Sequence, residues 1–359
     1  VVISGCVAQA EGEILLRKEK YIDAVIGPQS YHQFNETLLK AEKGVKKINS
    51  TEFEVIEKFD QLNHIKNSES KVSSFLTIQE GCNKFCKFCV VPYTRGAEYS
   101  RSIIELVQEC KSLVSNGAKE ITLLGQNVDS YLWYGGGLKK DFSKASEILK
   151  VSSINFAKLL EMCALTQPKM RIRFSTSNPQ DMSLDVIKVM SKYENICNYI
   201  HLPVQSGSNK VLKAMNRQHT REEYINLVEN IFQIIPDCSI SHDMISGFPN
   251  ESEQDHNDTL SLMEKVKYSF GYMFKYSERP GTLAAKKLED NIDEETKSRR
   301  LSEIVELQQK HSLYRSKEFV GKTVEVLIEK ESKKSNLHWA GRNQQNTTVV
   351  FPKENYSIG

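Results

Sequence analysis

The chain has 359 residues, which is enough for two or three domains with a sizeable core. Charged residues make up 26% and hydrophobic residues 39%, an ordinary balance for a globular protein. A net charge of only +2 excludes a uniformly basic nucleic-acid binder, so any such site is a local patch. No apolar run approaches the roughly 20 residues that cross a bilayer, and no secretory signal is visible. We therefore expect a cytoplasmic protein that binds no membrane.

The first part of the chain is α/β in character. An apolar strand opens it in "VVISGC", a helix-like stretch follows, and "DAVIG" is a second short strand. These elements predict an α/β domain over residues 1–60. No initiator Met precedes Val1, so we expect the start of this domain to be missing. A polar stretch with "NHIKNSESK" predicts a linker over residues 61–74.

Strands and helices alternate over residues 75–290. The strand-like runs are "FLTIQEG", "EITLLGQ", "RIRFSTS", "NYIHLPVQ", "SISHDMISGFP" and "YMFKYS". Amphipathic stretches such as 102–116 and 221–234 lie between them. This pattern predicts a parallel sheet or a partial barrel of βα units, with active-site residues at the C-terminal ends of the strands. The segment 135–153, "GGGLKKDFSKASEILKVSS", is expected to be an inserted loop.

The last seventy residues change in composition. Charged residues dominate up to Glu318, which predicts a long solvated helix that links domains over residues 291–318. The tail 319–359 alternates apolar and polar residues and suits a small antiparallel β-barrel. Because only three strands are predicted before Gly359, we expect this barrel to be incomplete.

Three cysteines lie within eight residues in "GCNKFCKFC", at Cys82, Cys86 and Cys89. Three thiolates can bind three irons of a 4Fe–4S cluster and leave the fourth iron open to a small molecule. The alternative is a zinc site completed by a distant His or Cys, as in a non-catalytic RNA-binding module. No second cysteine pair lies nearby, which favours the cluster. The cysteines expected in the core are Cys110, Cys163, Cys197 and Cys238.

The spacing of this trio resembles the signature of the radical S-adenosylmethionine superfamily. Other stretches resemble its MiaB-type tRNA methylthiotransferases: "SGCVAQ", "CVVPYTRG", "GQNVDSY", "HLPVQSGSNKVLKAMNRQHTREEY", "GFPNESEQD" and "YSERPGTLAA". The resemblance implies a partial (β/α)6 barrel and a C-terminal TRAM domain. It also implies an enzyme that adds a methylthio group to carbon 2 of N6-isopentenyladenosine at position 37 of tRNA. The alternatives within the branch act on N6-threonylcarbamoyladenosine or on a ribosomal protein.

The resemblance also implies cofactors and partners. Cys82, Cys86 and Cys89 would hold the cluster that binds S-adenosylmethionine, whose reductive cleavage yields a 5′-deoxyadenosyl radical. A second, auxiliary 4Fe–4S cluster would supply sulfur and would be held by Cys6 and two cysteines upstream of Val1. The implied partners are a tRNA anticodon stem-loop and an electron donor such as flavodoxin or ferredoxin. We expect a monomer.

Polar residues at the strand ends are candidates for holding S-adenosylmethionine. These strand-end candidates are Gln126, Asn127, Ser175, Ser177 and Gln205. The superfamily commonly has Gly-Gly-Glu after the second strand, where this chain has "LLGQN", so Gln126 is the expected substitute. For Ser177 the alternative role, shared with Asn178, is the N-cap of the following helix. His201 is either a site residue or a satisfied core histidine.

Four more residues complete the expected cosubstrate site. Arg217 resembles the position whose cation pairs with the methionine carboxylate, and a solvated helix-end arginine is the alternative. Asp243 would point into the barrel if its strand alternates, and a carboxylate among apolar neighbours needs a partner. Phe88 and Tyr276 are expected to pack against the adenine ring.

Aromatic and cationic side chains are candidates for RNA contacts. A base in the anticodon loop must leave its stack to reach the barrel mouth. Tyr93 and Arg95 beside the cluster and Arg279 in "YSERPGT" are the expected contacts there. The long helix carries basic faces that are further candidates. Each of their residues is individually more typical of a solvated surface: Arg299, Arg300, Arg315 and Lys317. The tail candidates for phosphate contact and base stacking are Lys322, His338, Trp339 and Arg342.

Overall fold

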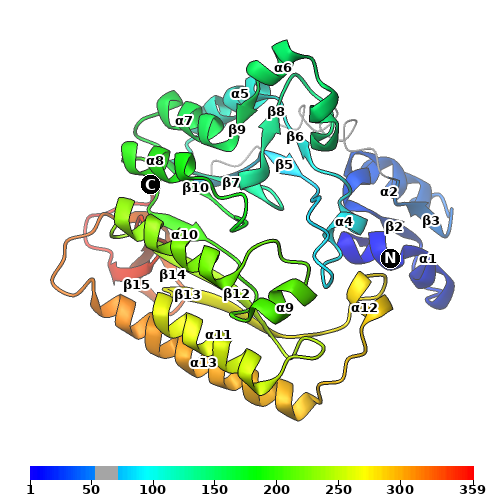
Figure 1. Ribbon diagram of the computed structural model, residues 1–359. Coiled ribbons are helices and arrows are strands. Elements are labelled where there is room, and N and C mark those ends of the chain that lie inside the picture. The colour runs from blue at the N-terminus through cyan, green and yellow to red at the C-terminus, as the bar shows by residue number, and fades with distance from the viewer. Residues whose placement is uncertain (53–71) are drawn as a thin grey trace.

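A computed structural model describes residues 1–52 and 72–359 (Figure 1). The predicted boundary at residue 60 and most of the predicted linker 61–74 lie outside these residues. Ser73 and Ser74, placed in the linker by the sequence, belong to the first barrel strand. Within the described part of the chain, no helix is long and apolar enough to cross a membrane.

The N-terminal segment is a small α/β unit, as the sequence predicted. Its strands form a parallel sheet in the order β1-β2-β3. Ala8 and Leu16 of the first helix pack against Val25 of the central strand. The elements are β1 (Val2–Ser4), α1 (Cys6–Lys18), β2 (Ala24–Ile26), the 3-10 helix η1 (Pro28–Gln33), α2 (Phe34–Glu42) and β3 (Ile48–Ser50).

Six parallel strands make up the central domain, one for each strand-like run in the sequence. They form two three-stranded sheets, β4-β7-β10 and β11-β12-β13. A parallel bridge between Ile172 and Ile196 joins the two sheets, so the strands follow chain order around a partial barrel. The strands are β4 (Ser73–Thr77), β7 (Glu120–Leu124), β10 (Arg171–Phe174), β11 (Tyr199–His201), β12 (Ser239–Ser246) and β13 (Phe270–Lys275).

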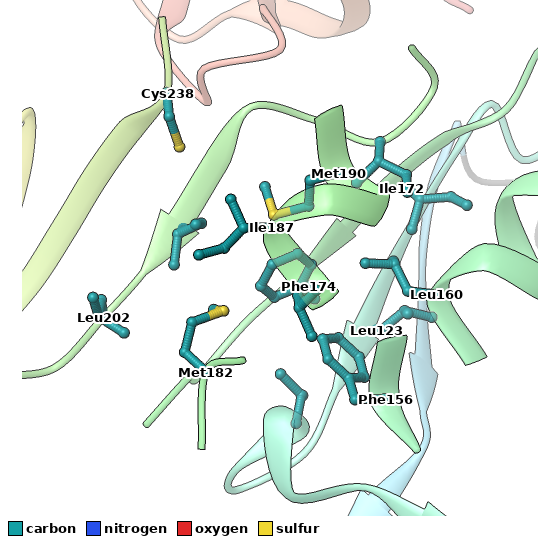
Figure 2. Close-up of a cluster of buried hydrophobic side chains, with 14 of the residues drawn as sticks. Leu123, Phe156, Leu160, Ile172, Phe174, Met182, Ile187, Met190, Leu202 and Cys238 are labelled. Carbon is teal, nitrogen blue, oxygen red and sulfur yellow. The ribbon is translucent and has the colours of Figure 1, made fainter. Parts of the chain in front are cut away.

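Helices cover the outer face of these strands and bury the main core there. Figure 2 shows this core, where the rings of Phe156 and Phe174 meet edge to face at 5.3 Å between Leu160 and Ile187. The two predicted amphipathic stretches are helices, and α10 begins with a capping box on Thr220. The large outer helices are α5 (Ile103–Ser115), α7 (Phe156–Thr166), α8 (Leu184–Lys192), α10 (Arg221–Ile234), α11 (Glu253–Val266) and α13 (Glu294–Lys317).

Short helices and strands lie in the loops that connect the main elements of the barrel. The expected inserted loop 135–153 carries a 3-10 helix and a short helix between two antiparallel strands, and it projects at the top of Figure 1. The short elements are β5 (Gln79–Glu80), α4 (Val91–Thr94), β6 (Tyr99–Ser100), η2 (Val128–Ser130), β8 (Leu132–Trp133), η3 (Lys139–Lys144), α6 (Glu147–Val151), β9 (Ile154–Asn155), α9 (Asn209–Ala214) and α12 (Leu283–Lys287).

The long helix α13 exists, but the prediction that it is merely solvated was wrong. One face is buried against α11 and β13. Gln308 donates from Nε2 to the Tyr268 carbonyl at 2.9 Å, and its Oε1 lies 2.9 Å from His242 Nε2. Arg300 pairs with the buried Glu251 at 2.9 Å. Polar residues on this face are therefore buried with partners from distant segments, which composition alone does not reveal.

The C-terminal tail forms an antiparallel sheet, with β14 (Leu327–Ser332), β15 (Ser335–Arg342) and β16 (Thr348–Pro352) in that order. These are the three predicted strands. The turn after β15 packs on the N-terminal end of the barrel, because Arg173 donates to the carbonyls of Asn343 and Gln344 at 2.5 and 3.0 Å. Arg342 reaches Glu120 at 2.8 Å. The tail therefore lies at the opposite end of the strands from the cysteine loop.

Candidate active site

The three-cysteine loop begins where β4 and β5 end, at the C-terminal edge of the barrel. Gly81 has φ +82°, and a Cβ there would lie 2.2 Å from the Ala97 carbonyl oxygen, so only glycine fits. The Cys82 amide donates to the Gly96 carbonyl at 3.1 Å, and the Cys89 amide donates to the Cys86 carbonyl at 2.9 Å. Backbone bonds thus fix the loop independently of any bound group.

Two glutamines fasten the start of this loop. The Gly81 amide donates to Gln126 Oε1 at 2.8 Å, and Gln79 Nε2 donates to the Gly81 carbonyl at 2.8 Å. Gln79 Oε1 in turn accepts from the Gln126 amide at 3.2 Å. The structure therefore gives the side-chain oxygen of Gln126 a loop-holding contact. Sequence reasoning missed Gln79, although a polar residue three positions before Cys82 was a usable signal.

A buried carboxylate supports the loop from behind. Glu98 Oε1 accepts from the Asn83 amide at 3.1 Å, and the Glu98 amide donates to Asn83 Oδ1 at 3.2 Å. The hydroxyl of Ser130 donates to the second oxygen of Glu98. Glu98 is 2% exposed. No pattern in the sequence marked this residue, because its partners come from three separate segments.

The three thiols are half-buried and influence one another. Burial, together with Glu98 and the other two cysteines, raises the pKa of Cys82 to about 12 against the lowering effect of a backbone hydrogen bond at Lys84. Burial also raises the pKa of Cys89, with Cys86 adding to the effect. Without a metal, the thiols of Cys82 and Cys89 are therefore protonated at neutral pH. They bind as thiolates only where a metal replaces the protons.

The donors that could hold a metal group on this loop are its three thiols. Among residues 1–52 and 72–359, no three His, Cys, Asp or Glu side chains gather as a single metal ion would require. Zinc holds its sulfurs within about 4 Å of one another, since each Zn–S bond is about 2.3 Å. A four-iron cluster binds each thiolate to a different iron and spaces them more widely. Three sulfur donors on one loop match the three protein-bound irons of a cluster with one open iron.

Arg217 lies at the loop, where the sequence placed it. Its Nη1 is 3.5 Å from the sulfur of Cys86, and its Nη2 donates to the Pro203 carbonyl at 2.6 Å. Its Nε is buried and has no hydrogen-bond partner in the described part of the chain. The guanidinium is thus a fixed cation beside the thiols and does not extend into solvent from a helix end.

Phe88 and Tyr276 come together in one apolar cluster, but they differ in how much ring surface is open to a ligand. Tyr276 is 4% exposed and meets the Phe248 ring edge to face at 5.1 Å. Phe88 packs against the same cluster and keeps part of its surface open. Phe88 is therefore placed to contact a bound ring, whereas the faces of Tyr276 are covered by protein.

Asn127 is buried and already engaged. Its Nδ2 donates to Asp181 Oδ2 at 2.6 Å, and Asp181 Oδ1 accepts from Lys84 Nζ at 2.9 Å. This chain of contacts ties the end of β7 to the cysteine loop through Lys84. The side-chain oxygen of Asn127 is buried without a partner among the described residues, so it is the atom left for a ligand.

The prediction that Ser177 or Asn178 caps the next helix was wrong. The N-cap of α8 is Ser183, whose hydroxyl accepts from the Val186 amide at 3.4 Å. Ser177 Oγ instead donates to Asp129 Oδ1 at 3.3 Å, and the Asn178 amide donates to Asp129 Oδ2 at 3.0 Å. Burial of Asp129 raises its pKa to about 7 against these hydrogen bonds. Ser175, two residues before Ser177, has its Oγ 3.5 Å from the Thr176 hydroxyl.

Gln205 and Asp243 meet at the junction of β11 and β12. The Gln205 amide donates to the Asp243 carbonyl at 2.9 Å, and Gln205 has φ +77°. His201 Nδ1 lies 2.8 Å from the Ser241 hydroxyl, and its Nε2 is 3.4 Å from Asp243 Oδ1 without the alignment of a hydrogen bond. His201 is thus a hydrogen-bonded interior residue beside a carboxylate.

Cys6 faces the barrel from the start of α1, which contacts α4 (Figure 1). Burial lowers the pKa of Arg95, but hydrogen bonds with Glu80 and Cys6 more than offset this and raise it. The Arg95 carbonyl also accepts from Gln29 Nε2 at 2.7 Å. Arg95 therefore joins the N-terminal unit to the barrel. Because Glu80 already holds its guanidinium in an ion pair, the geometry disfavours the expected RNA contact.

The tail arginine expected to contact RNA is also engaged. Arg342 pairs with Glu120 at 2.8 Å and with Glu329 at 2.6 Å, so it fastens the tail to the barrel. Trp339 donates from Nε1 to the Tyr356 carbonyl at 3.1 Å, and Lys353 Nζ lies 4.3 Å from its ring centroid. The geometry thus disfavours RNA contact by Arg342.

Other candidates remain open to a partner. Tyr93 is 41% exposed and stands edge-on to Phe85 beside the cysteine loop. Arg279 is exposed. On α13, Arg299 pairs with Glu253, at 2.8 Å, and with Glu303. Remaining candidates that are exposed or half-buried are Lys317, Lys322 and His338; Arg315, by contrast, donates to backbone carbonyls of the barrel.

Comparison with known proteins now identifies the family. Residues 76–263 match the profile of the Radical SAM superfamily, and residues 317–359 match the TRAM domain. A protein of Christiangramia forsetii named tRNA-2-methylthio-N(6)-dimethylallyladenosine synthase is 59% identical over the whole chain and 74% of its own length. Proteins with the same name from Flavobacterium johnsoniae and Karelsulcia muelleri are 57% and 52% identical, over 100% and 99% of the chain and 74% and 78% of their own lengths.

The chain belongs to the radical SAM family of tRNA-2-methylthio-N(6)-dimethylallyladenosine synthases. The predicted resemblance to MiaB-type methylthiotransferases is thereby confirmed. Membership in the superfamily implies an enzyme with a 4Fe–4S cluster and S-adenosylmethionine, and the loop of Cys82, Cys86 and Cys89 has the donors for that cluster.

Solved structures agree with this fold. The radical S-adenosylmethionine methyltransferase TsrM from Kitasatospora setae superposes with a TM-score of 0.58 at 12% identity, covering 79% of this chain and 56% of its own. The cobalamin-dependent radical enzyme OxsB gives a TM-score of 0.51 at 12% identity, covering 86% and 43%. At such low identity the likeness supports the barrel fold alone.

Proposed function

We propose that the chain adds a methylthio group to carbon 2 of N6-isopentenyladenosine at position 37 of tRNA. The observation that carries this proposal is the three-thiol loop with Arg217 at its side, in a chain 59% identical to a synthase with that name. The TRAM match supports tRNA as the partner. We also propose a monomer that works in the cytoplasm with flavodoxin or ferredoxin as its electron donor.

Cys82, Cys86 and Cys89 would hold the radical cluster. When bound, a cluster with one open iron supplies an electron to S-adenosylmethionine and thereby generates the radical that attacks a C–H bond. The protein holds the loop through Gln79, Gln126 and Glu98, and it places the Arg217 cation where a carboxylate can pair with it. Phe88 and the free oxygen of Asn127 are the further contacts that the geometry supports.

We propose that Cys6 is one ligand of an auxiliary cluster that serves as the sulfur source. Cys6 begins α1, and this helix contacts α4, which directly follows the radical loop. A sulfur donor held there would be close to the radical site. The proposed domains are residues 1–60 for this unit, 73–290 for the barrel and 319–359 for the TRAM domain.

Mass analysis of tRNA nucleosides tests the proposed reaction. Cells with the gene that encodes this chain should contain methylthiolated N6-isopentenyladenosine, and cells without it should accumulate the precursor lacking the methylthio group. Loss of a methylthiolated threonylcarbamoyl derivative in its place would assign the sister reaction. Unchanged tRNA nucleosides would contradict the proposal.

A further inference from the structure

The inner face of the second sheet can be read from its register. Ser241 pairs with Phe270, Asp243 with Tyr272 and Ile245 with Phe274, and paired residues of parallel strands share a face. The opposite face of β13 is the outer one, because a Cβ on Gly271 would meet His242, which contacts Gln308 of α13. Phe270, Tyr272 and Phe274 therefore face the barrel interior.

These three rings, here called the inner aromatic strip, are unusually open for aromatic side chains. Phe270 is 49% exposed, Tyr272 is 50% exposed and Phe274 is 52% exposed. The rings of Phe270 and Tyr272 are already ordered edge to face at 5.0 Å. Since β13 is the last strand of its sheet, the strip lies on an edge strand of the partial barrel. Exposed apolar surface of this kind marks a binding site.

A carboxylate lies beside the strip without a hydrogen-bond partner. Asp243 is next to Tyr272 in the register, and its Oδ1 is enclosed yet accepts no hydrogen bond from the described residues. The rest of the side chain is 26% exposed. His201 holds the region together, since it contacts both the Tyr272 ring at 5.8 Å and the Ser241 hydroxyl at 2.8 Å. His201 Nε2 lies 3.4 Å from Asp243 Oδ1 but is not aligned to donate a hydrogen bond, so this buried acceptor is left for a donor from a ligand.

We infer that the inner aromatic strip and Asp243 select the prenylated adenine, the strip receiving the five-carbon prenyl chain and the carboxylate accepting the N6–H. This inference rests on the proposed function and names the residues that determine its specificity. The substrate base carries one N–H donor next to an apolar branched chain. The interior offers one acceptor next to an apolar strip, so the two surfaces are complementary in order and in chemistry.

The same arrangement disfavours the sister substrate. A threonylcarbamoyl group ends in a carboxylate, which would lie near the Asp243 carboxylate in a site of low dielectric. Phe270 and Phe274 of the strip offer that group no hydrogen bonds. Discrimination therefore combines attraction for the prenyl chain with repulsion of the charged group.

Binding of three RNAs tests the inference without turnover. The probes are fluorescent anticodon stem-loops carrying adenosine, N6-isopentenyladenosine or N6-threonylcarbamoyladenosine at position 37, titrated with cluster-loaded protein in the absence of reductant. The wild-type protein should prefer the prenylated RNA over the unmodified RNA by about tenfold or more. Tyr272→Ala and Phe274→Ala should lose most of this preference while they bind the unmodified RNA as the wild type does. Asp243→Asn should bind the threonylcarbamoyl RNA about tenfold more tightly than the wild type does.

A matched control is Tyr314→Ala, because Tyr314 is 46% exposed but lies on α13, outside the barrel. It should keep the full preference for the prenylated RNA. The inference would be overturned if Tyr272→Ala kept the wild-type preference for prenylated over unmodified RNA. It would also be overturned if Tyr272→Ala lost affinity equally for all three RNAs. The inference would also be overturned if the wild-type protein methylthiolates the prenylated RNA but binds the prenylated and unmodified RNAs equally. That result would leave the proposed function intact. Failure to methylthiolate prenylated RNA would instead contradict the proposed function.

Discussion

The guanidinium of Arg217 lies 3.5 Å from the sulfur of Cys86, although 131 residues separate them in the sequence. The contact places a permanent cation at the edge of the loop that supplies three thiolates to the proposed cluster. Pro203 accepts a hydrogen bond from the same side chain at 2.6 Å, so the cation is held from both sides. This relationship links the barrel strands to the cysteine motif and underlies the first prediction.

Replacing Arg217 by Met should weaken binding of S-adenosylmethionine by about 10- to 100-fold, because a hydrogen bond to a charged group contributes about 1.5–3 kcal/mol. Equilibrium dialysis of cluster-loaded protein measures the affinity. Arg279→Met, which removes an exposed arginine, is the control and should bind the cosubstrate normally. Equal affinities of the two variants would show that Arg217 does not contact the cosubstrate.

The second prediction concerns the cysteines. Cys82→Ala should lower the iron content of anaerobically reconstituted protein by about four atoms per chain, because the remaining two thiolates cannot retain the cluster. Cys110→Ala should keep all of its iron, since Cys110 is a buried core residue that contacts Cys163. Iron and sulfide analysis with the visible spectrum gives the result. Full iron in Cys82→Ala would remove Cys82 from the cluster ligands.

The third prediction concerns the junction of barrel and tail. Arg173 and Glu120 form a buried ion pair at 2.8 Å, with Arg173 3% and Glu120 0% exposed. Arg173→Met should lower the free energy of unfolding by about 3 kcal/mol, because it removes one partner of a buried pair. Urea denaturation measures this change. The exposed pair of Lys188 and Asp185 supplies the control, and Lys188→Met should change stability by less than about 0.5 kcal/mol.

The fourth prediction is a pH dependence. Burial raises the pKa of Asp129 to about 7 in the folded chain from an ordinary 3.8. Between these values the unfolded chain has released a proton that the folded chain keeps, so the contribution of Asp129 to stability falls as pH rises. Asp129→Asn preserves the shape and cannot titrate. Its stability relative to the wild type should therefore increase between about pH 5 and about pH 8, as measured by urea midpoints. A constant difference would contradict the raised pKa.

Local patterns predicted the architecture well. The six strand runs, the helices at 102–116 and 221–234 and the three-cysteine loop are all present, because each depends on short-range periodicity or spacing. The four cysteines assigned to the core are buried for the same reason. Family resemblance added the chemistry, which spacing alone left open between a cluster and zinc.

Long-range pairing was what the sequence did not reveal. Arg342 pairs with Glu120 across 222 residues, and Arg300 pairs with Glu251 across 49. Both are structural ties, although the sequence suggested an RNA contact for Arg342 and a solvated surface position for Arg300. Tyr276 is likewise covered by Phe248. A charged or aromatic residue shows its availability only when the fold supplies or withholds a partner.

Methylthiolation of defined RNA tests the central claim most directly. Protein expressed from the gene that encodes this chain, reconstituted with iron and sulfide, would be given S-adenosylmethionine, a reductant and anticodon stem-loops with prenylated, threonylcarbamoylated or unmodified adenosine at position 37. Nucleoside mass spectrometry should show one methylthio group in place of one hydrogen on the prenylated adenosine, and on neither of the other two. A product on the threonylcarbamoyl RNA alone, or on none of the three, would contradict the assignment.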